Sequence, residues 1–157
     1  MRRVGFFLLT VCFAQTWLGA GTRAPQTAEA PASGRRVVAP PGVPVAGSYS
    51  PGVRAGQRLF LSGQLGRDPK TGDLLAGIGA QTRQAMENIG AVLGAAGMDH
   101  RHLVKCHVYL ASMDDYVGMN EAYARFFSGR VPARTTVEAV GLPRDAAVEI
   151  GCIAHGD

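Results

Sequence analysis

The chain has 157 residues, which is enough for one domain with a substantial core but too few for two. Hydrophobic residues make up 46% of it and charged residues 18%, as is usual for globular proteins, so a wholly disordered chain is excluded. The formal net charge is +4, and half of that excess comes from Arg2 and Arg3. The other cationic residues are scattered and form no stripe with aromatic residues, so we expect no nucleic-acid partner.

The N-terminus has the features of an export signal. The two arginines precede an apolar run over residues 4–18, and Gly-Ala-Gly at 19–21 offers a cleavage site. We therefore predict a signal peptide over residues 1–21 and an exported protein, periplasmic or secreted, that contacts a membrane only through this segment. The alternative is an uncleaved anchor, although the run falls short of the roughly 20 apolar residues that span a bilayer.

The folded domain is expected to cover residues 36–157, after a flexible linker over 22–35 that is rich in Ala, Pro and Thr. Short apolar runs predict strands at 37–39 and 58–62. A helix is predicted from 78 to 96, because its apolar residues recur at helical spacing and Gly97 supplies a stop. Those apolar positions are Ala85, Met86, Ile89, Val92, Leu93 and Ala96.

The second half of the domain continues with a strand over residues 103–110, in which apolar and polar residues alternate. Ser112 and the acidic residues after it resemble a capping box, and they predict a helix that runs through Phe127 and stops at Gly129. Two further strands are expected at 132–140 and 147–154. This order indicates an α+β fold with both helices on one face of the sheet. Identical subunits would cover the other face, so we predict a closed homo-oligomer.

Two cysteines remain outside the predicted signal, Cys106 and Cys152, and each lies on the apolar face of a predicted strand. We interpret them as small buried hydrophobic residues. In an exported protein they could also form a disulfide, and the sequence leaves that open because it does not show whether they are adjacent.

One arginine and one glutamate stand out in the last two strands. Strand alternation puts Arg134 on the same face as Thr136 and Glu138, and it puts Glu149 opposite the apolar face of the final strand. An arginine and a glutamate on sheet surfaces suggest a site that holds a carboxylate and moves a proton. The alternative is a cross-strand ion pair without function. We interpret Glu138, the rival carboxylate, as a structural residue.

The domain resembles the Rid family of reactive intermediate deaminases, the YjgF-like proteins to which RidA belongs, from about residue 37 to residue 154. Seven motifs carry the resemblance, in the family's order along the chain. They are Ala46-Gly47-Ser48-Tyr49-Ser50, Leu61-Ser62-Gly63-Gln64, Asp68-Pro69-Lys70-Thr71-Gly72, Gln81-Thr82-Arg83-Gln84 with Glu87-Asn88, Asn120-Glu121-Ala122-Tyr123, Pro132-Ala133-Arg134 and Val148-Glu149-Ile150.

The resemblance implies a chorismate-mutase-like fold, a barrel-like homotrimer and clefts between adjacent subunits. It implies hydrolysis of enamines and imines such as 2-aminoacrylate to 2-oxo acids and ammonia, without a metal or an organic cofactor. By the same resemblance, Arg134 would bind the substrate carboxylate and Glu149 would act on the attacking water. The residues that would line, border or shape the pocket are Tyr49, Ser62, Gly63, Asn120 and Thr136.

These roles are chemically reasonable. The planar guanidinium of Arg134 matches a carboxylate in bidentate fashion. One carboxyl group, on Glu149, can serve as both acid and base while an imine is hydrolysed. Three positions depart from the family pattern: Thr136 stands where many members have cysteine, Gly151 where a second acidic residue is frequent, and Ser48 where proline is common.

Other functions remain open at this point. A non-catalytic module that binds or senses a small carboxylate would use the same cleft, and ribonuclease activity, reported for some relatives, would need more concentrated positive charge. His100, His102 and His107 lack a further ligand at suitable spacing, so we expect no metal site.

Overall fold

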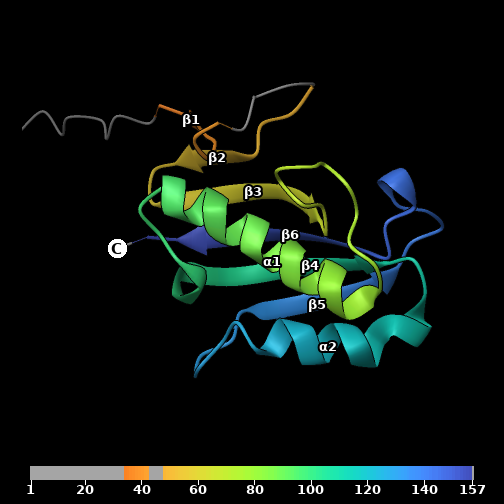
Figure 1. Ribbon diagram of the computed structural model, residues 1–157. Helices are drawn as coiled ribbons and strands as arrows, with labels where there is room; N and C mark the ends of the chain where they lie inside the picture. The colour runs from red at the N-terminus through yellow and green to blue at the C-terminus, as the bar shows by residue number, and fades with distance from the viewer. Residues whose placement is uncertain (1–33, 43–47, 157) are drawn as a thin grey trace, which may run out of the picture.

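The computed structural model describes residues 34–42 and 48–156 (Figure 1). The predicted signal peptide at 1–21 and most of the predicted linker at 22–35 lie outside these residues. Within the described ranges, no helix is both long enough and apolar enough to span a membrane.

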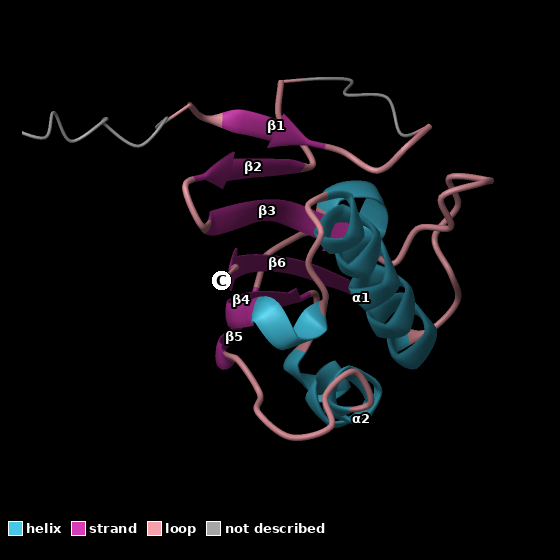
Figure 2. Cartoon of the chain, turned by 90° about the vertical axis from the view of Figure 1, so that its left-hand side faces the viewer, coloured by secondary structure: helices cyan, strands magenta, loops and turns pink. Residues whose placement is uncertain are grey.

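The described residues form one mixed sheet of six strands with two α-helices on one face (Figures 1 and 2). The sheet order is β1-β2-β3-β6-β4-β5; β4 and β5 pair in parallel and the other neighbours are antiparallel. The predicted α+β fold with both helices on one face is confirmed. The element bounds are β1 Arg36–Val38, β2 Gly52–Ala55, β3 Arg58–Leu65, α1 Ile78–Ala95, β4 Leu103–Leu110, α2 Tyr116–Ala124, β5 Ala133–Glu138 and β6 Val148–His155.

Strand β2 was not predicted from the sequence. It has only four residues, and a glycine occupies the position that faces the core. A Cβ built at Gly52 would lie 2.9 Å from Cγ1 of Val92, so the close approach of α1 to the sheet requires glycine there. A strand that buries a glycine has no apolar alternation to reveal it.

Helix α1 agrees closely with its prediction. The structure buries Ala85, Met86, Ile89, Val92 and Leu93 against the sheet. The helix ends in a Schellman motif, in which Met98 N donates to Leu93 O at 2.9 Å and Gly97 N donates to Gly94 O at 3.0 Å. Gly97 has φ +73°, a conformation that glycine adopts without steric cost, so the predicted stop is confirmed.

Helix α2 is shorter than predicted. The hydroxyl of Ser112 accepts a hydrogen bond from Asp114 N at 3.2 Å, but it starts a single 3₁₀ turn, Met113–Asp115, before α2 begins at Tyr116. The helix ends at Ala124, and the chain then leaves through i→i+3 hydrogen bonds from the amides of Phe126 and Phe127. Phe127 still packs against the core. Its apolar contact therefore follows helical spacing although the residue lies outside the helix.

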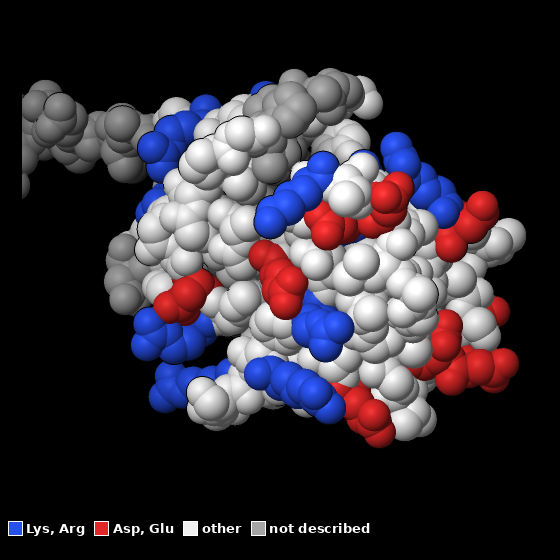
Figure 3. Space-filling view, viewed as in Figure 1, with Lys and Arg blue, Asp and Glu red and all other residues white. Residues whose placement is uncertain are grey.

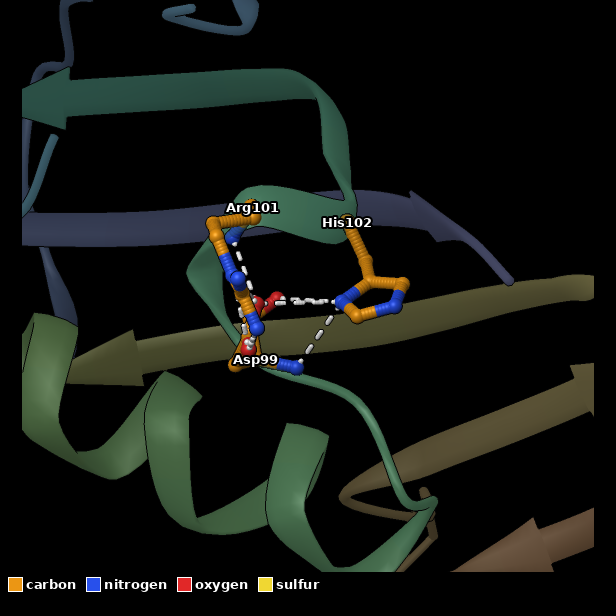
Figure 4. Close-up of polar contacts among 3 residues, drawn as sticks. All are labelled: Asp99, Arg101 and His102. Carbon is orange, nitrogen blue, oxygen red and sulfur yellow. Dashed lines mark hydrogen bonds and ion pairs between the residues drawn. The ribbon is translucent and has the colours of Figure 1, made fainter. Parts of the chain in front are cut away.

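A compact polar turn connects α1 to β4 (Figure 4). The Asp99 carboxylate accepts hydrogen bonds from the backbone amide and guanidinium of Arg101, and it lies 3.1 Å from Nδ1 of His102. The side-chain hydrogen bond from Arg101 is the main cause that lowers the pKa of Asp99. His100, whose Nε2 lies 2.9 Å from Met86 O, contacts α1. Two of the three histidines considered for metal binding thus serve this connection.

The core lies between the helices and one face of the sheet. Strands β6 and β4, next to each other in the sheet, carry Val148, Ile150, Val108 and Leu110 on that face, all fully buried. Residues of odd number in β6, from Glu149 to His155, point to the opposite face. We call this second face the open face, because no described helix covers it (Figure 2).

The structure joins Cys106 and Cys152 by a disulfide. The two residues are directly opposite in the β4·β6 register, with Cα atoms 4.2 Å apart, and both are buried. Antiparallel neighbours without a mutual hydrogen bond approach to about this distance, so a bridge fits there. The predicted burial is confirmed, and of the two possibilities that the sequence left open the structure shows the disulfide.

Removing this disulfide should destabilise the domain. It links positions 46 residues apart, so its loss frees the unfolded chain, at a typical cost of about 2–4 kcal/mol. Urea unfolding with and without dithiothreitol would measure the change. The double variant Cys106→Ala/Cys152→Ala should unfold at the same urea concentration in both conditions. The prediction would be contradicted if the wild type had the same urea midpoint with and without dithiothreitol.

Candidate active site

Arg134 projects from β5, an edge strand, toward helix α2. Its register partner in β4 is Cys106, which faces the core, so Arg134 lies on the helix-covered side of the sheet. The guanidinium carbon lies 4.9 Å from the ring centre of Tyr123 and 5.8 Å from that of Tyr116. Its Nη2 donates to the Tyr116 hydroxyl at 3.4 Å, and its Nη1 lies 3.9 Å from the sulfur of Met119.

The polar groups around Arg134 are only partly satisfied. The hydroxyls of Tyr123 and Thr136 are buried and have no hydrogen-bond partner. Burial raises the pKa of Tyr123 to about 12, although nearby Arg134 opposes the shift. The pKa of the Tyr116 hydroxyl is lowered, mainly by a side-chain hydrogen bond with Asn120 and secondly by the charge of Arg134. We call the residues around this guanidinium the Arg134 half-site, which consists of Tyr116, Met119, Asn120, Tyr123, Arg134 and Thr136.

Glu149 lies on the open face of β6, at the edge of a shallow hollow of about 310 Å³. Its register neighbours are Tyr109 in β4 and Leu65 in β3. The hollow combines one carboxylate, one imidazole and one phenol with apolar walls. We call its lining the Glu149 half-site, which consists of Phe60, Leu61, Gly63, His107, Tyr109, Glu149, Gly151, Cys152 and Ile153.

Gly63 sets the position of Glu149. The β3·β6 pairing shifts register between Leu61 and Gln64, so Gly63 lies in a β-bulge beside Glu149. A Cβ built at Gly63 would overlap the Glu149 carboxylate. Only glycine therefore leaves room for this side chain as it stands.

Ser62 directly precedes Gly63 in β3, and Tyr49 lies in the loop before β2. The Ser62 hydroxyl donates to Ser50 O at 2.6 Å, and its amide donates to Pro51 O at 3.0 Å, so Ser62 attaches the preceding loop to β3. Tyr49, in that loop, is 65% exposed. The hydroxyl of Ser62 thus has a structural partner, and the phenol of Tyr49 is accessible.

Arg134 and Glu149 do not meet within one chain. Strands β5 and β6 both flank β4, and the two side chains leave opposite faces of the sheet. The alternative of a cross-strand ion pair between them is therefore wrong. Glu138 accepts a hydrogen bond from Met113 N at 2.7 Å, which gives it a structural role at the start of the turn before α2.

Several residues of the two half-sites were missed from the sequence. Tyr116, Met119 and Tyr123 follow i, i+3, i+7 spacing on α2, a pattern that usually indicates core packing, and the sequence analysis assigned them no role in the site. Nothing in the sequence distinguishes an aromatic that packs from one that also faces a cation. Phe60, His107 and Tyr109 line the hollow because of strand register, which the sequence does not specify.

Residues 41–156 match the protein family described as endoribonuclease L-PSP, which includes the YjgF and RidA proteins. The chain belongs to this family.

Relatives in the family agree in sequence and fold. A RutC family protein of Pyrococcus horikoshii is 47% identical over 110 residues, covering 69% of this chain and 87% of its own. The mouse 2-iminobutanoate/2-iminopropanoate deaminase is 40% identical over 122 residues, covering 76% of this chain and 90% of its own. The crystal structure of Escherichia coli TdcF with bound serine has 32% identity and a TM-score of 0.73, covering 78% of this chain and 99% of that one. The family therefore contains deaminases of small imino acids.

Replacing Ser62 by alanine should destabilise the protein moderately. The variant loses the hydrogen bond to Ser50 O and leaves that carbonyl without its donor, at a cost of about 1 kcal/mol. Urea unfolding would measure the difference. Ser128→Ala, at an exposed position, is the matched control and should change stability by less than about 0.5 kcal/mol. Equal effects of the two substitutions would rule out the structural role of Ser62.

Proposed function

We propose that this protein hydrolyses small 2-imino acids and their enamine tautomers, such as 2-aminoacrylate, to 2-oxo acids and ammonia. The site lies between two copies of the chain, with Arg134 from one copy and Glu149 from the next, in a closed homotrimer. One observation carries the proposal: a cation suited to a carboxylate and an acid suited to proton transfer lie on opposite faces of one sheet. The Arg134 half-site contains no carboxylate, and the Glu149 half-site contains no arginine or lysine.

Cyclic symmetry can bring the two half-sites together. In a ring, the edge of each subunit meets a face of the next, so residues from opposite faces of one chain can share a single cleft. The open face carries exposed apolar side chains from three strands, Phe60 at 44%, Tyr109 at 39% and Val137 at 42%. Large exposed apolar groups favour coverage by a partner. Edge strand β5 forms the border of this face and carries Arg134 on its other side.

The proposed chemistry needs only these side chains and water. Arg134 binds the substrate carboxylate through two parallel N–H donors. Protonation of the imine nitrogen makes its carbon electrophilic, and an enamine first takes that proton at its terminal carbon. Glu149 accepts a proton from the water that adds to the imine carbon, and then delivers it to the amine nitrogen. As the C–N bond of the carbinolamine breaks, its hydroxyl group gives its proton to Glu149, and ammonia leaves the new carbonyl group; Glu149 then releases this proton to water.

Two relatives support the substrate class. The mouse relative is named a deaminase of 2-iminobutanoate and 2-iminopropanoate, and TdcF was solved with serine. Each of these molecules carries a carboxylate beside a nitrogen-bearing carbon. The Arg134 half-site fits such a ligand, because no described carboxylate lies within ion-pair distance of the guanidinium.

The activity can be tested by generating imino acid with an amino-acid oxidase in the presence of semicarbazide. The protein should suppress semicarbazone formation. Arg134→Ala and Glu149→Gln should each reduce this suppression by about 10²-fold or more, because they remove substrate binding and proton transfer respectively. Arg83→Ala, which removes an exposed arginine on α1, is the control. The proposal fails if the wild type does not suppress the product, or if Arg134→Ala suppresses it equally well.

Mixed oligomers test whether the site is shared. Co-expression of Arg134→Ala with Glu149→Gln should restore about a quarter of wild-type activity, because one random site in four receives both intact residues. The control is the double variant Arg134→Ala/Glu149→Gln co-expressed with the single variant Arg134→Ala, which can form no complete site. No recovery in the first mixture would contradict a site built from two copies.

Glycine at position 63 should be essential for activity without being essential for folding. Gly63→Ala forces the flexible Glu149 side chain away, so we expect a loss of imine hydrolysis of about 10²-fold with only a small change in unfolding midpoint. Gly94→Ala is the control, because a Cβ there meets nothing within 4 Å. Full activity of Gly63→Ala would show that the position of Glu149 does not matter.

A second candidate function is binding of a small carboxylate without turnover. It is favoured by the observation that the Arg134 half-site is assembled entirely within one chain, from β5 and α2. Calorimetry with pyruvate would then give saturable binding that depends on Arg134 and is unchanged in Glu149→Gln, with no ammonia released from any imine.

Ribonuclease activity has less support than either. Basic and acidic side chains are interspersed over the face that carries α1 and α2, without a continuous basic track (Figure 3). Binding of RNA normally relies on such concentrated positive charge and weakens steeply with salt.

A further inference from the structure

The guanidinium of Arg134 is held by aromatic rings instead of by an acid. We propose that Tyr123, assisted by Tyr116, is a positioning residue: its ring face fixes the Arg134 guanidinium for a carboxylate ligand while leaving the positive charge uncompensated. This inference rests on the proposed function, since it explains how the carboxylate-binding group is prepared.

The geometry supports a cation–π arrangement. The guanidinium carbon lies 4.9 Å from the Tyr123 ring centre and 5.8 Å from that of Tyr116, both within the roughly 6 Å over which such attraction is significant. Tyr123 is only 5% exposed, so water screens the contact little. Two rings and the Met119 sulfur thus restrict the guanidinium without neutralising it.

A carboxylate in the same place would have a different effect. It would occupy the two parallel N–H donors that a ligand carboxylate needs, and it would cancel the charge that attracts the ligand. Glu138 lies on the same face of β5, but its carboxylate accepts the Met113 amide at 2.7 Å. Within the described part of the chain, this acid is therefore engaged elsewhere, and neutral groups support Arg134.

The ring of Tyr123, and not its hydroxyl, is the part that acts. The hydroxyl is buried and has no hydrogen-bond partner, which costs stability without serving a contact. Burial raises the pKa of Tyr123 to about 12, so the phenol stays neutral and its π face alone meets the cation. Replacement by phenylalanine keeps that face, whereas replacement by leucine keeps burial but removes it.

The experiment compares Tyr123→Phe with Tyr123→Leu in the full-length protein. Pyruvate binding by calorimetry and the KM for imino acid should weaken about tenfold in Tyr123→Leu and stay within about twofold of wild type in Tyr123→Phe, while kcat changes little in both. Binding of pyruvamide, which has no negative charge, should be equally weak in all three proteins. A merely structural role of Tyr123 would not separate the charged ligand from the neutral one.

A measurement without ligand tests the contact between the rings and the guanidinium separately from the proposed function. Ring currents should shift the Arg134 side-chain proton resonances upfield in the wild type and in Tyr123→Phe, and this shift should disappear in Tyr123→Leu. If Tyr123→Leu does not fold, Tyr116→Leu, at a partly exposed position, should lose part of the shift and part of the pyruvate affinity.

The outcomes separate the two ideas. A wild type that neither hydrolyses imines nor binds pyruvate overturns the proposed function, and the resonances then decide whether the rings hold the guanidinium. Unchanged resonances and unchanged pyruvate affinity in Tyr123→Leu overturn the positioning role while leaving the proposed function intact. An equal loss of affinity in Tyr123→Phe and Tyr123→Leu also overturns it, because the hydroxyl would then be the active part.

Discussion

Strand alternation is the constraint on which the rest of this structure depends. The helices bury one face of the sheet, so every strand residue is committed either to the core or to the open face. Val148 and Ile150 belong to the core, which puts Glu149 between them on the open face. Arg134 pairs with Cys106 and is committed to the helix side. No rotation of a side chain can bring the two groups together through the sheet.

This constraint explains why the apolar open face and the divided site are linked. A chain that could assemble Arg134 and Glu149 by itself would not need a partner for chemistry. With the two groups on opposite faces, the proposed oligomer would serve chemistry and cover the apolar face at once, through a second copy placed against the edge at β5. In that proposal, association would bury Phe60 and Val137 and also complete the set of catalytic groups.

The sequence predicted the main elements because their signals were local. Helix α1 follows from its apolar spacing and from Gly97, and β4 follows from its alternation. Strand β2 was missed because it buries Gly52, and the end of α2 was misplaced because Phe127 keeps its apolar contact after the helix has stopped. The disulfide could not be predicted because it depends on the β4·β6 register, which involves residues 46 positions apart.

The candidate site was predictable only in part, for the same reason. The motifs single out Arg134, Glu149 and Gly63 as residue types, and strand alternation gives the face of each relative to its own strand. The sequence does not say which strands are neighbours, so an ion pair between Arg134 and Glu149 looked possible until the sheet order placed β4 between them. The support of Arg134 by Tyr116 and Tyr123 was invisible, because an aromatic stripe on a helix usually signals core.

The two half-sites also differ in how many contacts hold their charged side chain, and this difference fits the roles proposed for them. The Arg134 guanidinium is held by two rings and a thioether, with one ring almost fully buried, so in the proposed function the ligand's charged end would meet a prepared partner. Glu149 instead stands in an open hollow beside Gly63, and its position depends on the space that this glycine leaves. Anchoring a carboxylate requires a fixed donor fork, whereas a group that first takes and then returns a proton must serve two positions. A cation held by two rings and an acid in an open hollow suit those two tasks.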